Sequence, residues 1–276
     1  MEILLTLYNE ILGFLRISQA WEILKTGDYS VFTTYDGIRA FISPIIPLLL
    51  IFELILGLIY KKSDTKVYKI NFLIYVFNRF IGRFIALGMV VICIGVFQKY
   101  APFQTEMTWY WFIYGYIVWE LGHFIHHYLG HKVRLFWCLH STHHAPENMN
   151  LSVNYAHFFL EAPYADTIRT TVCILLGVQP EMLFLIMFID GSYGAFIHVG
   201  ENMIKDARFG FLNKIMLTPS HHRVHHARNP LYIDTNYCNL LNIWDRAFKT
   251  YQEEQREVAI EYGINRKIDS GNFFDV

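Results

Sequence analysis

Histidine is the residue type that most constrains how this chain can fold, because most of its histidines are spaced as metal ligands are. All 13 histidines lie between His123 and His226. Eight of them form three groups: His127 and His131; His140, His143 and His144; and His222, His225 and His226. Residues at i, i+3 and i+4 share one face of a helix, so each group predicts a helix that presents its imidazoles together. Eight imidazoles are too many for one ion, and they fit two ions that keep open positions. The chain must then bring three separate helices to one place.

Local signals define two of these helices. Thr218 is a suitable N-cap and Pro219 a suitable first helical residue, so the third group should occupy the first turns of a helix. Pro146 should end the helix that carries the middle group. The alternative is that each motif is a chance grouping of surface or core histidines. Three such groups in one chain argue against chance.

The composition is that of a membrane protein. Of the 276 residues, 54% are hydrophobic and 17% aromatic, and the mean hydropathy is +0.26, which is too apolar for an ordinary soluble domain. A net charge of −1 gives no indication of a nucleic-acid partner. Four cysteines without CxxC spacing indicate reduced thiols.

Four apolar regions predict an all-α, polytopic bundle with about four membrane spans or two hairpins. They are residues 41–60, 84–97, 107–125 and 168–198. The second can extend back through 72–77, and residues 179–181 divide the fourth into two arms. Residues 1–40 are expected to form an amphipathic, interfacial segment, residues 41–251 the membrane domain, and residues 252–276 a polar tail.

The charge pattern orients the bundle. The loop between the first two regions carries Lys61, Lys62, Lys66 and Lys69. Cytosolic loops are enriched in Lys and Arg, so this loop should be cytosolic, and the three histidine groups should meet on the same face. That face belongs to the inner membrane in a bacterium and to the endoplasmic reticulum in a eukaryote. The segment after Ala227 is expected to cover the site as a cytosolic helical layer.

Two stretches carry a family resemblance. HSTHHAPENMNLS (140–152) and the longer stretch 217–251, which begins LTPSHHRVHHARNP, resemble the fatty acid hydroxylase / sterol desaturase superfamily of membrane non-haem di-iron oxygenases. Within it they are most similar to the alkylglycerol monooxygenase branch. The resemblance runs from about residue 41 to residue 251. Two positions depart from the branch: Lys132 replaces a Glu, and Cys238 stands where Gly is frequent.

The resemblance implies residue roles. The eight motif histidines would bind two iron ions and form the catalytic centre, with His222 rather than His221 as the ligand. His198 would be a further ligand. Three residues would support the ligands from outside: Glu120, Asn202 and Asp245. His123 and His126 are expected to pack against the site or support it.

The function expected from these features is O2-dependent hydroxylation of an alkyl or acyl chain in a membrane lipid or sterol-like substrate. No GxGxxG fingerprint is present, so a separate reductase or other donor should supply the electrons. A lipid desaturase with the same centre is an alternative. A zinc-dependent membrane hydrolase is another, although such sites use three ligands. A metal transporter or storage protein would need ligands at mid-depth in the membrane.

Overall fold

The computed structural model describes residues 12, 17–27, 29–60 and 65–266. Within them the chain is helical, and the β-structure is limited to two isolated bridges. The predicted all-α class is confirmed. Of the predicted interfacial segment, residues 1–40, most of the part before residue 17 lies outside the described residues. Lys61, Lys62 and the last ten residues of the predicted polar tail also lie outside them.

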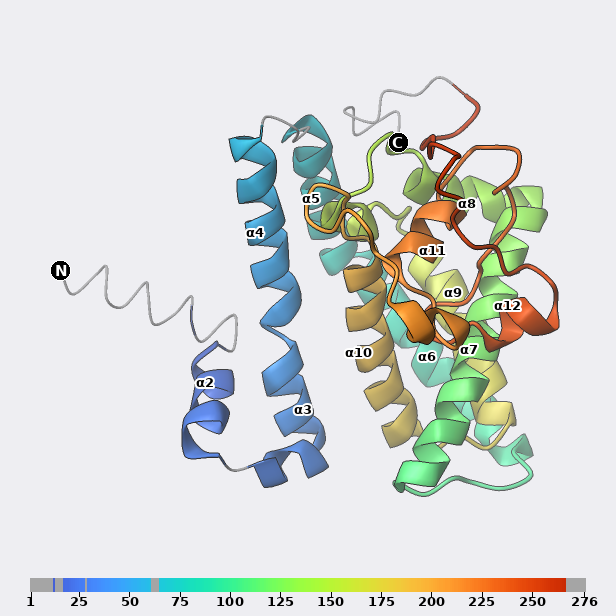
Figure 1. Ribbon diagram of the computed structural model, residues 1–276. Coiled ribbons are helices and arrows are strands. Elements are labelled where there is room, and N and C mark those ends of the chain that lie inside the picture. Colours follow the sequence, from blue (N-terminus) through green and yellow to red (C-terminus); the bar gives the residue numbers. More distant parts are fainter. Residues whose placement is uncertain (1–11, 13–16, 28, 61–64, 267–276) are drawn as a thin grey trace.

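The elements follow one another along the whole described chain (Figure 1). The longer helices are α2 (Ile17–Thr26), α3 (Tyr35–Ile42), α4 (Ile45–Ile59), α5 (Thr65–Phe80), α6 (Gly82–Phe97), α7 (Trp109–Lys132), α8 (Arg134–His144), α9 (Glu161–Leu175) and α10 (Pro180–Ile197). Two short α-helices follow, α11 (Pro219–His225) and α12 (Ile243–Ala247). The 3-10 helices are η1 (Tyr29–Thr33), η2 (Gln98–Tyr100), η3 (Leu151–Tyr155) and η4 (Gly210–Lys214).

Three stretches of helix in the described part are long and apolar enough to cross a membrane. They are Tyr35–Ile59, Gly82–Tyr100 and Pro180–Ile197. They match the first, second and last predicted regions. The predicted region 107–125 lies in α7, which is not among the three. Its second half carries Glu120 and the first histidines, and these lower its hydropathy.

The outer helices present apolar side chains to their surroundings. Only 17% of the apolar window in Tyr35–Ile59 and 22% of that in Gly82–Tyr100 are buried, against 39% for Pro180–Ile197. Phe52 on α4 and Phe84 on α6 are exposed. A soluble protein rarely leaves such a surface open, so lipid is the natural contact for α4 and α6.

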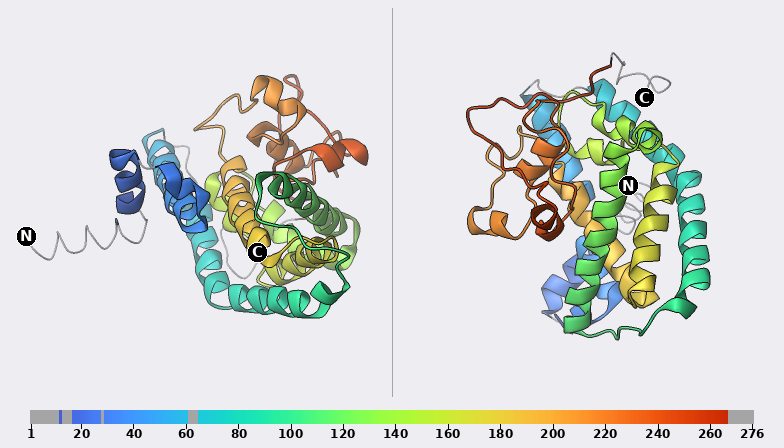
Figure 2. Two further views of the ribbon diagram at one scale, coloured as in Figure 1. Left: turned by 90° about the horizontal axis from the view of Figure 1, so that it is seen from below. Right: turned by 90° about the vertical axis from the view of Figure 1, so that its right-hand side faces the viewer.

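The inner helices form the core. α9 packs along both α6 and α7, and α10 packs on α7, an arrangement visible from two sides in Figure 2. Trp119 of α7, Ile174 of α9 and Ile186 of α10 are buried together. Gly122 permits the closest approach, because a Cβ there would lie 2.9 Å from the Cα of Arg169 on α9. This rigid core positions the end of α7, where the first histidine group begins.

The histidine-bearing elements gather toward one end of the bundle. Figure 1 and the right panel of Figure 2 show α8, the end of α4 and the start of α5 at that end, and the loop from α6 to α7 at the opposite end. The expected helical layer after residue 227 is mostly loop, with α12 its one α-helix among the described residues. The buried side chains of Asn236 and Asp245 hydrogen-bond part of its backbone, at Gln252, Tyr237 and Cys238, in place of helical hydrogen bonds.

Candidate metal centre

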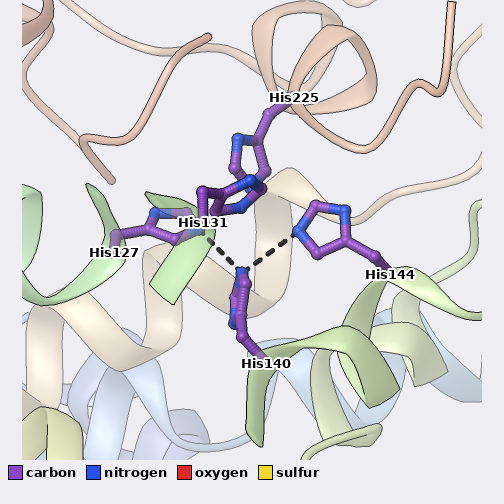
Figure 3. A group of neighbouring side chains, drawn as sticks. All are labelled: His127, His131, His140, His144 and His225. Atoms are coloured by element: carbon purple, nitrogen blue, oxygen red, sulfur yellow. Dashed lines mark hydrogen bonds between the residues drawn. The ribbon is translucent and has the colours of Figure 1, made fainter. Parts of the chain in front are cut away.

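Nine histidines form two adjoining clusters. In each cluster the ligand atoms lie within 4.8 Å of one another. The first cluster is His127, His131, His140, His144 and His225 (Figure 3). The second cluster is His143, His198, His222 and His226. The structure therefore brings together all eight motif histidines and His198.

The two clusters share their helices. On α8, His140 and His144 face the first cluster, whereas His143 faces the second. On α11 and its C-cap the division is reversed, with His225 in the first cluster and His222 and His226 in the second. The predicted start of α11 is confirmed, with Thr218 as its N-cap and Pro219 in its first turn. His144 and His226 lie side by side across the two clusters, with ring centroids 4.4 Å apart.

Outer partners fix the orientation of several rings. A carbonyl or carboxylate oxygen can only accept, so a ring nitrogen that contacts one carries the proton, and the other nitrogen of that ring presents its lone pair. Four Nδ1 atoms have such partners: His127 with the Tyr237 carbonyl at 2.8 Å, His225 with the Thr235 carbonyl at 2.8 Å, His198 with the Gly194 carbonyl at 2.6 Å and His140 with the Glu161 carboxylate at 2.6 Å. Their Nε2 lone pairs are left for the clusters.

The closest nitrogen pairs fit a shared cation. The Nε2 atoms of His127 and His140 lie 3.1 Å apart, and both lack a proton because Nδ1 carries it. Two lone pairs at this distance repel unless a positive charge lies between them. In the same cluster, the buried Nε2 atoms of His131 and His225 have no hydrogen-bond partner. These four nitrogens are arranged as ligands and have no other use in the described structure.

Metal geometry accounts for the spacing in both clusters. A metal–imidazole bond of about 2.0–2.1 Å with ligands about 90–110° apart separates the nitrogens by about 2.9–3.4 Å. In the second cluster, His198 Nε2 lies 3.1 Å from His143 Nε2 and 2.9 Å from His222 Nε2. An all-imidazole donor set suits iron, copper, nickel or zinc. Both clusters are thus able to bind metal ions.

Burial keeps the imidazoles neutral. It lowers the pKa of His131 to about 4 and that of His198 to about 3. The pKa is also lowered, mainly by burial, in His143, His144, His222, His225 and His226. Neutral imidazole is the form that binds metals, so these ligands need not release protons first.

Glu161, the first residue of α9, was missed by the sequence analysis. Its two oxygens contact His140 Nδ1 at 2.6 Å and His157 Nδ1 at 2.8 Å. The His157 ring stacks on His143 of the second cluster, with centroids 4.2 Å apart. Burial alone would raise the pKa of Glu161, but the two histidines lower it to about 2. One carboxylate therefore connects the surroundings of both clusters, and no motif spacing announces it.

Lys132, one of the two departures from the family pattern, has a partner close to the site. Its ammonium pairs with Asp234, and the same carboxylate lies 3.6 Å from His131 Nδ1. The hydrogen bonds of His131 and Lys132 hold the pKa of Asp234 well below its ordinary value. The changed residue thus acts on a cluster histidine through Asp234.

Glu120 and Asp245 hold one loop. The structure differs from the prediction that Glu120 orients an imidazole. The Glu120 carboxylate instead accepts hydrogen bonds from the backbone N–H groups of Asn239, Leu240 and Leu241. Asp245 accepts from the backbone N–H groups of Tyr237 and Cys238 and from the Thr250 hydroxyl. Both carboxylates are fully buried. They fix the segment whose Tyr237 carbonyl binds His127.

Asn202 is away from the clusters, and its expected supporting role is corrected. The expectation required α10 to continue for another turn, but α10 ends at Ile197 with His198 as its C-cap. Asn202 follows in a turn, is exposed, and lines a cavity described below.

The remaining histidines lie outside the clusters. His221 forms the capping box of α11 with Thr218, and its Nε2 lies 2.8 Å from the Tyr251 hydroxyl. His123 Nδ1 is 3.7 Å from Asp190. The ring of His126 packs against that of His123.

Comparison with known proteins agrees with this geometry. A family model described as fatty acid hydroxylase matches residues 112–250. The alkylglycerol monooxygenase of Danio rerio is 28% identical over 273 residues, which cover 94% of this chain and 59% of that protein. The corresponding protein of Homo sapiens is 33% identical over 169 residues, covering 61% of this chain and 36% of that protein. The ornithine lipid hydroxylase OlsE of Rhizobium tropici is 29% identical over 160 residues, which cover 58% of this chain and 47% of that protein.

The extent of the matches is uneven. This chain spans between 35% and 59% of the length of the four alkylglycerol monooxygenases that it matches. No solved structure matches the chain.

Proposed function

This chain belongs to the fatty acid hydroxylase family, and on that premise we propose that it is an O2-dependent lipid hydroxylase. The observation that carries the proposal is the pair of adjoining all-histidine clusters, with ligand atoms within 4.8 Å in each. Single-metal hydrolases use three protein ligands and one open position. Nine converging imidazoles exceed that need and suit two ions.

The proposed ligand assignment follows the two clusters. The five histidines of the first cluster would together hold one iron ion, and the four histidines of the second cluster would hold the other. The second site would therefore keep more open coordination positions than the first. When bound, the iron pair supplies the oxygen chemistry that an unactivated C–H bond requires. One oxygen atom enters the C–H bond, the other leaves as water, and a separate reductant provides two electrons and two protons.

The protein contributes position and dryness. The Nδ1 contacts to Tyr237, Thr235 and Glu161 hold the rings in fixed orientations. Every cluster histidine except His131 is buried, and His131 nearly so, which keeps bulk water from the centre. The exposed apolar faces of α4 and α6 would contact the lipids from which the substrate chain comes.

The proposed substrate is an alkyl or acyl chain of a membrane lipid. The matched relatives are named for two different lipids, an alkylglycerol and an ornithine lipid. Their shared chemistry is oxygen insertion into a lipid. We further propose that the centre faces the cytosol, since the start of α5, whose sequence includes Lys66 and Lys69, lies at the end of the bundle that carries α8.

The decisive experiment loads the purified protein with ferrous iron under anaerobic conditions and then admits O2 with membrane lipids and a reductant. Substrate-dependent O2 uptake and a product heavier by one oxygen are expected by mass spectrometry. A product that has lost two hydrogens would identify a desaturase instead. Lipid cleavage by the zinc-loaded protein under argon, with no O2 uptake by the iron-loaded protein, would refute the proposal in favour of a hydrolase.

A further inference from the structure

A polar cavity of about 130 Å³ lies beside the second cluster. Its walls come from α4, α5, the segment that follows α8, the segment that follows α10, and Tyr262 near the end of the described chain. None of the proposed metal ligands lines it. The cavity is therefore a feature separate from the metal centre.

Glu53 forms the inner wall of this cavity. It lies within an otherwise apolar helix that is a candidate membrane span, yet it is only 3% exposed. Its carboxylate accepts bonds from the Tyr68 hydroxyl at 3.0 Å and from the backbone N–H groups of Leu151 and Gly200, both at 2.7 Å. An ionisable residue inside a span usually has a functional task. Here it joins α4 to both segments that leave the histidine-bearing helices.

The contact of Gly200 with Met149 and Glu53 is tight. A Cβ on Gly200 would lie 2.7 Å from the Met149 carbonyl oxygen and 3.0 Å from Glu53 Oε1. Only glycine fits without displacing this wall, so the wall is built to hold its shape.

The outer wall is polar and accessible. Glu201 is exposed, and its carboxylate accepts a bond from the Tyr262 hydroxyl at 3.0 Å. The exposed amides of Asn148 and Asn202 complete the rim. Among the described residues that line the cavity, none is a lysine or an arginine.

The buried Arg223 is not among the lining residues, although its charge acts on Glu53 and Tyr262 in the cavity wall. The Arg223 guanidinium donates to the carbonyl oxygens of Val199, Ile204 and Lys205. The described lining thus offers the carboxylates of Glu53 and Glu201, together with asparagine amides that both accept and donate. It favours a group that donates N–H or O–H bonds and disfavours phosphate.

The cavity adjoins the second cluster. Gly200 is two residues from His198, so their Cα atoms are at most about 7 Å apart. A group bound in the cavity would therefore lie near the second cluster without contacting its histidines.

We propose that this cavity binds the polar headgroup of the lipid substrate, and that this headgroup is rich in N–H or O–H donors and carries no phosphate. The inference rests on the proposed function. A cavity of about 150 Å³ holds benzene, so this one suits a group of about six non-hydrogen atoms, such as a glycerol unit or a short amine-bearing chain. The oxidised carbon would then be close to the headgroup and not at the far end of the chain.

The test measures binding without turnover. The iron-loaded protein in phosphatidylcholine nanodiscs is titrated anaerobically with three probes that share an octyl-sized tail: 1-O-octylglycerol, N-octanoyl-ethylenediamine and octyl phosphate. We expect the glycerol and amine probes to bind at least about tenfold more tightly than octyl phosphate. Equal binding of all three would overturn the inference.

A charge reversal sharpens the test. Glu201→Lys should weaken binding of the amine probe by about tenfold and strengthen that of octyl phosphate. The matched control is Glu147→Lys, which makes the same change at an exposed position that does not line the cavity. Identical effects of the two variants would also overturn the inference.

Failure of the inference is distinguishable from failure of the proposed function. Lipid oxidation without headgroup preference would support the proposed hydroxylase function and refute the headgroup site. Selective binding of the glycerol and amine probes, without O2 uptake with any electron donor, would support the headgroup site and refute the proposed hydroxylase function.

Discussion

His221 and His222 are neighbours on one short helix, and their surroundings differ completely. His222 Nε2 lies 2.9 Å from His198 Nε2 in the second cluster, whereas His221 caps its own helix through Thr218. Spacing cannot distinguish them, since either residue gives three histidines in a similar pattern. The family register at the sequence level favoured His222, and the geometry groups His222 with the other cluster residues.

This pair gives a matched test of the ligand assignment. His222→Ala should abolish turnover and lower the iron content measured by plasma mass spectrometry. His221→Ala should keep the iron and lose about 0.5–2 kcal/mol of stability with the cap. Equal iron content in the two purified variants would contradict the assignment.

The contacts of Glu161 with His140 and His157 can be tested by a substitution. Glu161→Gln leaves one oxygen and places an NH2 group against one of the two histidines, so one ring loses its acceptor. Loss of such an outer partner typically lowers metal affinity by about 10–100-fold. Competition with a calibrated chelator would measure it. Glu147→Gln at an exposed position serves as the control, and unchanged affinity in Glu161→Gln would remove the positioning role.

The site was predictable where ligands repeat along a helix, and hidden where they do not. Eight of the proposed ligands follow i, i+3 and i+4 spacing, and the proposed ninth, His198, rests on the family resemblance. Glu161 and the Thr235 and Tyr237 carbonyls belong to segments distant in sequence, and only tertiary packing brings them to the imidazoles. The supporting role predicted for Asn202 is wrong because α10 ends at Ile197, so Asn202 does not share a helix face with His198.

Among the elements, α7 and α9 depend on glycine for their contact. Gly122→Ala would place a Cβ 2.9 Å from the Cα of Arg169 and should destabilise the fold by about 1–3 kcal/mol. Gly88→Ala on α6 meets nothing within 4 Å and should be neutral or stabilising by up to about 1 kcal/mol. Thermal unfolding in detergent compares the two. An equal shift in Tm would show that the contact is looser than described.

The loop over 236–241 depends on buried carboxylates. Asp245→Asn should leave one backbone N–H of Tyr237 or Cys238 without an acceptor, at a cost of about 1–3 kcal/mol. Hydrogen exchange of peptides covering this loop should speed up, and the His127 contact should weaken. Asp206→Asn, at a surface carboxylate, is the control. Unchanged exchange in Asp245→Asn would refute the bracing role.

Element types were predictable from local signals, whereas the loop-rich cover was not. α11 begins at Pro219 as predicted, and the predicted division at residues 179–181 coincides with the start of α10 at Pro180. The segment after residue 227 has the polar composition of a surface helix. Its backbone is instead hydrogen-bonded in part by the side chains of Asn236 and Asp245, and side-chain contacts of this kind have no periodic signature.

At the scale of the whole molecule, the bundle places α8 and the loop from α6 to α7 at opposite ends. Cys138 on α8 is exposed, whereas Cys93, Cys173 and Cys238 are buried. A membrane-impermeant maleimide should therefore label the unmodified protein only from the cytosolic side.

The control for sidedness uses the opposite loop. Gln104→Cys in a Cys138→Ser background puts one exposed thiol between α6 and α7. It should be labelled only from the non-cytosolic side. Labelling of both thiols from one side would refute the proposed orientation.

The ligands and their anchors are spread over more than a hundred residues, from His127 to Tyr237, and Asp245 follows later still. A nascent chain cannot complete either cluster until this last stretch has left the ribosome. The proposed iron ions would then enter after synthesis, into a completed fold whose imidazoles are already neutral. The amount of working protein in a cell would accordingly follow iron supply as well as expression level.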